Sequence, residues 1–258
     1  MTAPMRSPDH TPAKQERLRY MANAIFWHWA QKGGPFYAID CCAGDCKVEF
    51  GQSSPQVIHD AMVRSGGKIL GLYLAEHTRK TCDALRRNTR RFQVPTFVIN
   101  NEFQEAINMV LMESIAGKRG LIYIDIIGLS VHEPIWLCDL FSDQRLKDAS
   151  ILINWFVNPC KRGSRIQSQP TISPLDRTRD DIFHIERKYK YISPPFGKHG
   201  VTHLFYTNEN HGLLECILEA SGEYEDEDGN RYALHPWRSP YGRDLLEKAF
   251  LLKDEDWA

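Results

Sequence analysis

The sequence predicts an α/β fold in which a doubly wound, mostly parallel sheet carries one antiparallel edge strand. Short apolar runs alternate along the chain with segments of helical periodicity, which is the pattern of successive strand-helix-strand units. The run at residues 36–40 ends in an acid and is followed by small residues around Gly44. This is typical of a buried strand that passes into a tight turn where backbone can approach a ligand.

Composition sets broad limits on the function. A chain of 258 residues with 42% hydrophobic residues can bury a substantial core within one domain. Its 32 basic and 33 acidic residues leave a formal net charge of -1, so contact with a nucleic acid would need a local basic patch. No apolar stretch is long enough to span a bilayer, and residues 1–10 lack the apolar centre of a secretion signal. We therefore expect a cytoplasmic protein.

The seven cysteines indicate reduced thiols. Their number is odd and most lie in apolar runs, which does not suit a disulfide framework. Cys41, Cys42 and Cys46 form a cluster, but no matching Cys/His pair at zinc-site spacing follows them. No metal site is expected.

The first helix and the first strand lead into an unusual loop. Thr11 and Pro12 begin a helix whose apolar residues recur at helical spacing until Gly33 and Gly34 end it. After the strand at 36–40, a polar loop runs to a second helix start at residues 53–55. The glycine pattern G-x-G-x-x-G is absent, which argues against an ordinary dinucleotide site.

The second and third strands end in polar residues suited to a nucleoside. The second strand, residues 68–75, is followed by Glu76, whose carboxylate would accept hydrogen bonds from ribose hydroxyls. An exposed acid at a strand end is the ordinary interpretation, but the strand position and the preceding turn favour ribose binding. The third strand, residues 95–99, is followed by Asn100 and Asn101, and either amide could hold an adenine amino group.

The helix predicted over residues 78–91 carries the densest basic run in the chain. Such a run is usually a solvated helix face. The alternative interpretation is a patch that contacts the phosphates of a nucleic acid. Its basic residues are Arg79, Lys80, Arg86, Arg87, Arg90 and Arg91.

The fourth strand, residues 120–127, contains a single acid, Asp125, near its carboxyl end. A charge within such an apolar run is costly to bury unless it is paired or lies at the mouth of the sheet, where ligands of open α/β sheets bind.

The remaining elements complete the predicted organisation. A fifth strand at 150–157 precedes an irregular insertion at 159–187, followed by closing strands at 189–192 and 201–207 and helices at 212–220 and 242–252. We expect a flexible tail at residues 1–10, one Rossmann-like domain at 11–220, and a C-terminal extension at 221–258 packed on that domain.

Several of these residues together resemble class I S-adenosylmethionine-dependent methyltransferases. They are the turn at 37–44, the Gly-x-Ser-Ser-Pro loop at 51–55, Glu76, Asn100 with Asn101, and the fourth strand at 122–129. Within that class, the chain most resembles the three-Cys-motif partner proteins. It departs from them at Cys42, Cys46 and Ile126, where that family tends to have phenylalanine, glycine and proline.

The resemblance implies an S-adenosylmethionine site at the carboxyl edge of the sheet. It implies that Asp40, Ala43 and Gly44 shape the methionine end, that Glu76 binds the ribose, and that Asn100 or Asn101 binds the adenine. Asp125 would be the catalytic residue beside the transferred methyl. The acceptor would be a nucleic acid or a nucleotide-like molecule, and the alternative is a catalytically inactive partner subunit.

A second motif competes with Asp125. Residues 193–196, Ser-Pro-Pro-Phe, match the short signature by which amino-methyltransferases grip an exocyclic amine of a flipped base. That signature belongs after the fourth strand, whereas this tetrapeptide follows the fifth, so a plain turn is favoured.

Overall fold

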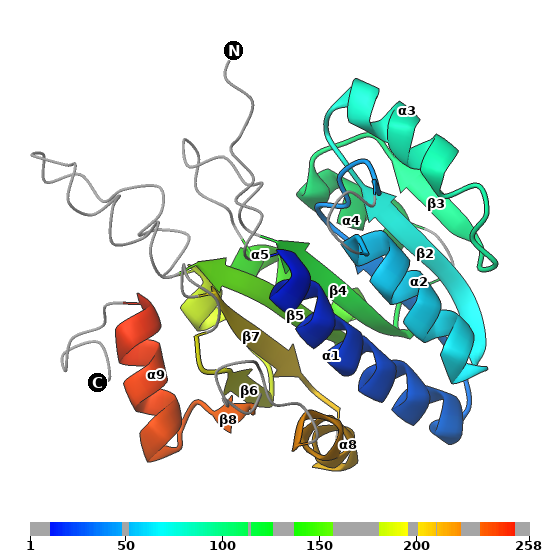
Figure 1. Cartoon of the computed structure of the whole chain (residues 1–258). Coiled ribbons are helices and arrows are strands. Elements are labelled where there is room, and N and C mark those ends of the chain that lie inside the picture. The colour runs from blue at the N-terminus through cyan, green and yellow to red at the C-terminus, as the bar shows by residue number, and fades with distance from the viewer. Residues whose placement is uncertain are drawn as a thin grey trace, which may run out of the picture.

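The computed structural model describes residues 11–47, 52–112, 115–125, 137–156, 181–195, 201–209, 211–222 and 233–250. Within these residues, eight strands form one sheet in the order β3-β2-β1-β4-β5-β7-β6-β8 (Figure 1). The strands are β1 (Pro35–Asp40), β2 (Lys68–Ala75), β3 (Thr96–Ile99), β4 (Arg119–Asp125), β5 (Ala149–Phe156), β6 (Tyr189–Ile192), β7 (Val201–Thr207) and β8 (His235–Pro236).

Strand directions confirm the predicted fold class. The pairs β1–β2, β2–β3, β1–β4 and β4–β5 are all parallel. Strand β7 runs antiparallel to both β5 and β6, and the short strand β8 pairs antiparallel with β6 at the edge. The strand order reverses between β1 and β4, which creates the topological switch point where open α/β sheets bind ligands.

Helices cover both faces of the sheet, as a doubly wound fold requires. One buried cluster packs α1, α2 and α8 on one face, and a second packs α4, α5 and α9 on the other. Figure 1 shows α1 crossing in front of β4 and β5. The helices are α1 (Thr11–Lys32), α2 (Ser54–Ser65), α3 (Arg79–Asn88), α4 (Phe103–Leu111), α5 (Leu137–Ser142), the 3-10 helix η2 (Gln144–Leu146), α8 (His211–Gly222) and α9 (Pro240–Phe250).

The two segments assigned outside the central pattern also contribute to the core. Residues 181–185, at the end of the predicted insertion, bury Ile182 and Ile185 completely. Leu246 and Phe250 of α9 are buried in the same cluster. Residues 1–10, 157–180 and 223–232 lie outside the described residues. In the part of the chain that is described, no helix has the length and apolarity needed to cross a bilayer.

The turn after β1 contains backbone in the left-handed region. Gly44 has a φ of 62° and Cys46 a φ of 56°. Glycine adopts this conformation without steric cost, whereas a residue with a Cβ is strained there. Cys46 is one of the positions where the chain departs from the family it resembles, so its side chain carries a backbone cost that glycine would avoid.

This strain gives a stability prediction. The free energy of unfolding of Cys46→Gly should exceed that of Cys46→Ala by about 1 kcal/mol. This order is expected although glycine removes more side-chain atoms from this buried site. Both variants lose the Cys46 Sγ contact with Ser53 Oγ at 3.1 Å, so their difference isolates the backbone. Urea unfolding measures it, and an alanine variant as stable as the glycine variant would contradict the assignment of strain.

Candidate functional site

The carboxyl ends of β1, β2 and β4 bring the three predicted acids to one edge of the sheet. Asp40 is the last residue of β1, Asp125 is the last residue of β4, and Glu76 directly follows β2. Strand β1 lies between the other two, so the acids gather at and beside the switch point. This is the ligand-binding position of an open parallel sheet.

Asp40 is fully buried and only partly satisfied. Its Oδ1 accepts a hydrogen bond from the Cys42 backbone N–H at 3.2 Å, and the Ser54 side chain also stabilises the carboxylate. Among the described residues, its Oδ2 has no partner at hydrogen-bond distance. Burial raises the pKa of Asp40 to about 7, and the charge of Asp125 adds to the rise, against the opposing effects of Ser54, Cys42 and Lys14. A cation or donor that reached Oδ2 would favour the charged carboxylate.

Asp125 is paired with a lysine that the sequence analysis missed. Its Oδ2 contacts the Nζ of Lys14 in the first turns of α1, and the two side chains are only 16% and 14% exposed. Its Oδ1 has no hydrogen-bond partner. Lys14 lies four residues before the buried Leu18, so its place on the inner face of α1 was the available signal.

A row of polar side chains extends from Asp125 across the sheet. Asn154 of β5 is in register with Asp125, and His203 of β7 is in register with Asn154. Asn154 donates to the hydroxyl of Tyr123 at 2.5 Å, and its Oδ1 has no partner. Burial, with the charges of Arg17 and Lys14, holds the pKa of His203 well below its ordinary value, so the imidazole is neutral. Sequence reasoning missed this row because each residue lies inside an apolar run.

Glu76, Asn100 and Asn101 all have local partners at this edge. The Oε1 of Glu76 accepts from the Thr78 backbone N–H at 3.0 Å. Asn100 donates its amide to the carbonyls of Glu76 at 3.1 Å and His77 at 2.8 Å. Asn101 accepts from the Glu102 backbone N–H at 2.9 Å. Adenine binding by Asn100 or Asn101 therefore stays a prediction.

The turn after β1 is fastened to neighbouring elements. The Ala43 backbone N–H donates to the Ala75 carbonyl of β2 at 3.1 Å, and Asn88 of α3 donates to the Asp45 carbonyl at 2.7 Å. Ala43 is buried and Gly44 has the positive φ described above. These bonds hold the backbone of the turn beside Asp40 and Glu76.

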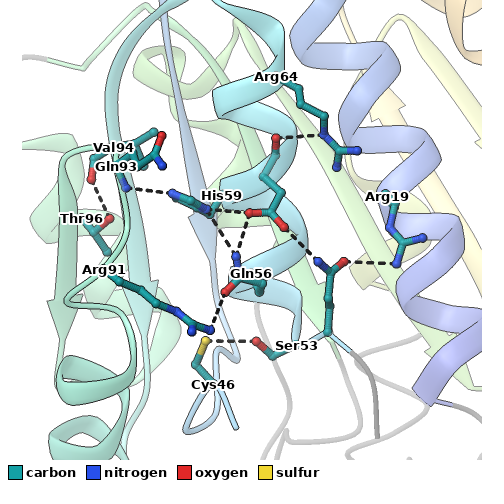
Figure 2. Close-up of polar contacts among 12 residues, drawn as sticks. Arg19, Cys46, Ser53, Gln56, His59, Arg64, Arg91, Gln93, Val94 and Thr96 are labelled. Atoms are coloured by element: carbon teal, nitrogen blue, oxygen red, sulfur yellow. Dashed lines mark hydrogen bonds and ion pairs between the residues drawn. The ribbon is translucent and has the colours of Figure 1, made fainter. Parts of the chain in front are cut away.

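A hydrogen-bond network centred on Asp60 of α2 holds the far end of the same loop (Figure 2). The Asp60 carboxylate accepts from Gln52 Nε2 at 2.9 Å, from Gln56 Nε2 at 2.7 Å and from His59 Nδ1 at 2.8 Å. Gln52 in turn accepts from Arg19 of α1 at 3.1 Å. The network therefore ties the end of the loop to α1 and α2, two of the helices that cover this face of the sheet.

The tautomer of His59 follows from its partners. Its Nε2 accepts the backbone N–H of Gln93 at 2.9 Å, so Nδ1 carries the proton that it donates to Asp60. The ring also stacks on Phe92 with centroids 4.1 Å apart. The Nε2 bond and the stack on Phe92 hold α2 against the segment that follows α3, while the Nδ1 bond to Asp60 fixes the ring within α2, so His59 has a positioning role in the scaffold.

The clustered thiols are protonated side chains. Burial raises the pKa of Cys41 and of Cys42 well above the ordinary value for a thiol. A thiolate is the form that acts as nucleophile or metal ligand. Among the described residues, no group of three His, Cys, Asp or Glu side chains is placed to hold a metal ion.

Two surface pockets among the described residues lie away from the acids. One is lined by Gly34, Arg119 and Glu209 among others, at the amino ends of β1 and β4. The other lies beside α2 and is lined by residues that include Arg19, Asp60 and Gln93. Residues 48–51 and 126–136, which follow β1 and β4 in the chain, lie outside the described residues. We place the candidate site by its chemistry, at the strand ends.

The Ser-Pro-Pro-Phe motif begins three strands away from Asp125 in the sheet. Its first three residues follow β6, which is separated from β4 by β5 and β7. Ser193 is buried and its groups are used in the β6–β7 connection, where its Oγ accepts from the His203 backbone N–H at 2.9 Å. Phe196 lies outside the described residues.

The basic helix α3 lies beside β3 at one edge of the sheet (Figure 1). All six basic residues named in the sequence analysis are exposed. Arg86 pairs with Asp83 at 3.1 Å, and Arg91 donates to Gln56 at 3.5 Å. Four of the six lie on α3, whereas Arg90 and Arg91 follow its last residue, Asn88, so the helix is shorter than the predicted range of 78–91. The helix and the segment after it therefore present positive charge to solvent near the turn that Asn88 holds.

Comparisons with known proteins identify the fold. No protein-family model matches the chain, and no curated protein matches it in sequence. Among solved structures, protein LPL1258 from Legionella pneumophila superposes with a TM-score of 0.55 at 12% identity, over 86% of this chain and 96% of that one. This likeness shows a shared fold.

Two further matches are more distant. The O-methyltransferase from Bacillus cereus, in complex with SAH, has a TM-score of 0.48 at 12% identity, over 79% of this chain and 84% of that one. The O-methyltransferase TomG from Streptomyces achromogenes, in complex with SAM, has a TM-score of 0.46 at 13% identity, over 76% and 80%.

The buried carboxyl of Asp40 predicts a pH-dependent stability difference. The folded protein keeps this proton up to about pH 7, whereas an ordinary aspartate loses it near 3.8, so wild-type stability falls as pH rises through that window. Asp40→Asn lacks this loss. The difference in Tm, Asp40→Asn minus wild type, should therefore increase by several degrees between pH 4 and pH 8. Thermal unfolding at each pH measures it.

The exposed Asp83→Asn is the matched control and should show no such trend. A difference between wild type and Asp40→Asn that stays constant over this pH range would show that Asp40 titrates as an ordinary aspartate.

Proposed function

We propose that this protein is a class I S-adenosylmethionine-dependent methyltransferase. The observation that carries the proposal is the convergence of Asp40, Asp125 and Glu76 at the switch point of the sheet. Among the described residues, one oxygen of Asp40 and one of Asp125 have no donor at hydrogen-bond distance. The motif resemblance supports the same conclusion. We also propose that the protein is most closely related to the three-Cys-motif partner proteins. Its methyltransferase domain would comprise residues 11–220, with residues 221–258 packed on it as an extension.

The residues at the strand ends fit the cofactor. A buried acceptor without a donor, Asp40 Oδ2, suits the ammonium at the methionine end, and an acid after β2 suits the ribose diol. The backbone of Ala43 and Gly44 would border the methionine end, and Asn100 or Asn101 would border the adenine. When bound, the cofactor supplies a methyl group on an electrophilic sulfonium.

Asp125 has the place and chemistry to orient the acceptor. In-line methyl transfer needs little covalent help from a protein, so positioning of the nucleophile dominates. The carboxylate of Asp125 would accept a hydrogen bond from the N–H or O–H group of the methyl acceptor. If methyl transfer requires that group to lose its proton, the carboxylate would receive the proton.

The acceptor that we propose is a nucleic acid or a nucleotide-like molecule. The supporting feature is the exposed positive face of α3, close to the turn after β1. A second basic stretch, residues 161–165, lies outside the described residues.

A second candidate is a methyltransferase-fold partner subunit that binds the cofactor without transferring methyl groups. One observation favours it. The carboxylate of Asp125, which the acceptor would need, is already engaged by Lys14. Methyl transfer itself separates the two candidates.

Cofactor binding is the first test. S-adenosylhomocysteine should bind the wild-type protein in calorimetry, and Glu76→Ala should weaken binding roughly tenfold or more because hydrogen bonds to a carboxylate are lost. Glu105→Ala, an exposed acid on α4, should leave the affinity unchanged. Absence of binding, or equal affinity in Glu76→Ala, would refute the cofactor site.

Asp125→Ala tests catalysis separately. It should abolish methyl transfer from labelled S-adenosylmethionine to DNA, RNA or protein pools while largely keeping cofactor affinity. Binding by the wild-type protein without transfer to any pool would identify the inactive partner subunit.

The basic helix gives a salt-dependent prediction. Arg87→Gln combined with Arg90→Gln should weaken RNA or DNA binding and reduce the slope of log K against log salt by about 1.4 to 1.8, because two phosphate contacts are lost. Lys118→Gln combined with Lys248→Gln removes equal charge from exposed sites elsewhere. Fluorescence anisotropy at several salt concentrations measures both, and equal slopes in the two double variants would exclude α3 as the contact.

A further inference from the structure

Acceptor atoms of the candidate site are buried. Three acceptor atoms at the strand ends, Asp40 Oδ2, Asp125 Oδ1 and Asn154 Oδ1, are buried from solvent and have no donor. Asp40 and Asn154 are completely buried. Unsatisfied buried acceptors are costly, and they gather here at the position where this fold binds ligands.

Lys14 contacts one of these residues, through the other oxygen of the Asp125 carboxylate. It projects from the first turns of α1 onto Asp125, and its positive charge also acts on Asp40 and on His203. Its ammonium is a positive charge beside Asp125 and Asp40, whose own strands carry no basic residue next to them. The structure thus shows a primary ammonium, the protein's own, bound in the candidate site.

We propose that Lys14 is a latch that closes the cofactor site and that is released when the ammonium of the cofactor's methionine end binds Asp40. This inference rests on the proposed function. The release frees the carboxylate of Asp125 for the methyl acceptor, so occupancy of the cofactor site prepares the acceptor site.

Electrostatics favour exchange over joint occupancy. A second ammonium beside Lys14 would meet a like charge in a buried site, where screening is weak. The first turn of α1 also has few bonds to lose, because the first four N–H groups of any helix lack partners within the helix. Release of Lys14 therefore costs mainly its pair with Asp125, and the ligand's own charge replaces its effect on Asp40.

Hydrogen-deuterium exchange tests the latch directly. S-adenosylhomocysteine, which has the ammonium, should increase exchange of the backbone amides at residues 14–20. The compound 5′-methylthioadenosine, which has the nucleoside but no ammonium, should leave them unchanged. Both ligands should reduce exchange at residues 72–80, around Glu76. Unchanged or reduced exchange at residues 14–20 with S-adenosylhomocysteine would overturn the latch.

Substitutions at Lys14 provide the matched series. Lys14→Met has no ammonium to displace, so binding S-adenosylhomocysteine should no longer change exchange at residues 14–20, and its affinity relative to 5′-methylthioadenosine should rise about tenfold. Lys14→Arg keeps the charge and should behave as wild type. The affinity change alone does not show release, because a Lys14 that stayed beside the ligand would also repel the ligand's ammonium. The hydrogen exchange of residues 14–20 decides whether Lys14 is released or retained.

The outcomes separate this inference from the proposed function. If neither adenosine ligand binds the wild-type protein, the proposed function fails and the latch with it. If both bind and residues 14–20 do not respond, the function stands and the latch fails. The wild-type exchange experiment decides the question even if Lys14→Met does not fold.

Discussion

The buried carboxylate of Asp40 is the constraint on which the site depends. It lies at the end of β1, fully enclosed, with one oxygen unsatisfied and its pKa raised to about 7. Burying such a group costs free energy that the apolar core on both faces of the sheet must offset. Structures accept costs of this kind where a ligand uses them. The ion pair of Asp125 with Lys14 and the turn held by the Ala43 N–H both lie at the same edge of the sheet as this group.

The scaffold around Asp40 is rigid on one side and openable on the other. The loop after β1 is held at its far end by Asp60, which accepts three side-chain donors, and by the stacked ring of His59. Opposite it, Asp125 is covered by a single ion pair from the beginning of α1. A region with few contacts opens at a lower free-energy cost than one with many, so the side of Lys14 is the one at which we expect local opening.

The fold and the positions of the acids could be predicted because both are local signals. Apolar periodicity marked β1 to β5 and α1 to α4, and an acid directly after an apolar run marks a strand end. Lys14 and Asp125 are 111 residues apart, and no local pattern announces their contact. For Asn100 and Asn101, the residue type could be read from the sequence. That nearby backbone carbonyls and amides already bond to their side chains could not. The two-residue β8 is too short for any periodicity.

The basic character of α3 has a consequence for the sheet itself. Strand β3 is an edge strand, and its unpaired backbone could template pairing with the same edge of another molecule. Pairing two such edges would bring two strongly cationic helices together, and like charges oppose it. The other edge is β8, where Pro236 has no N–H to donate. Each edge thus carries its own protection against pairing with another molecule, so the sheet that carries the candidate site resists growth by strand addition.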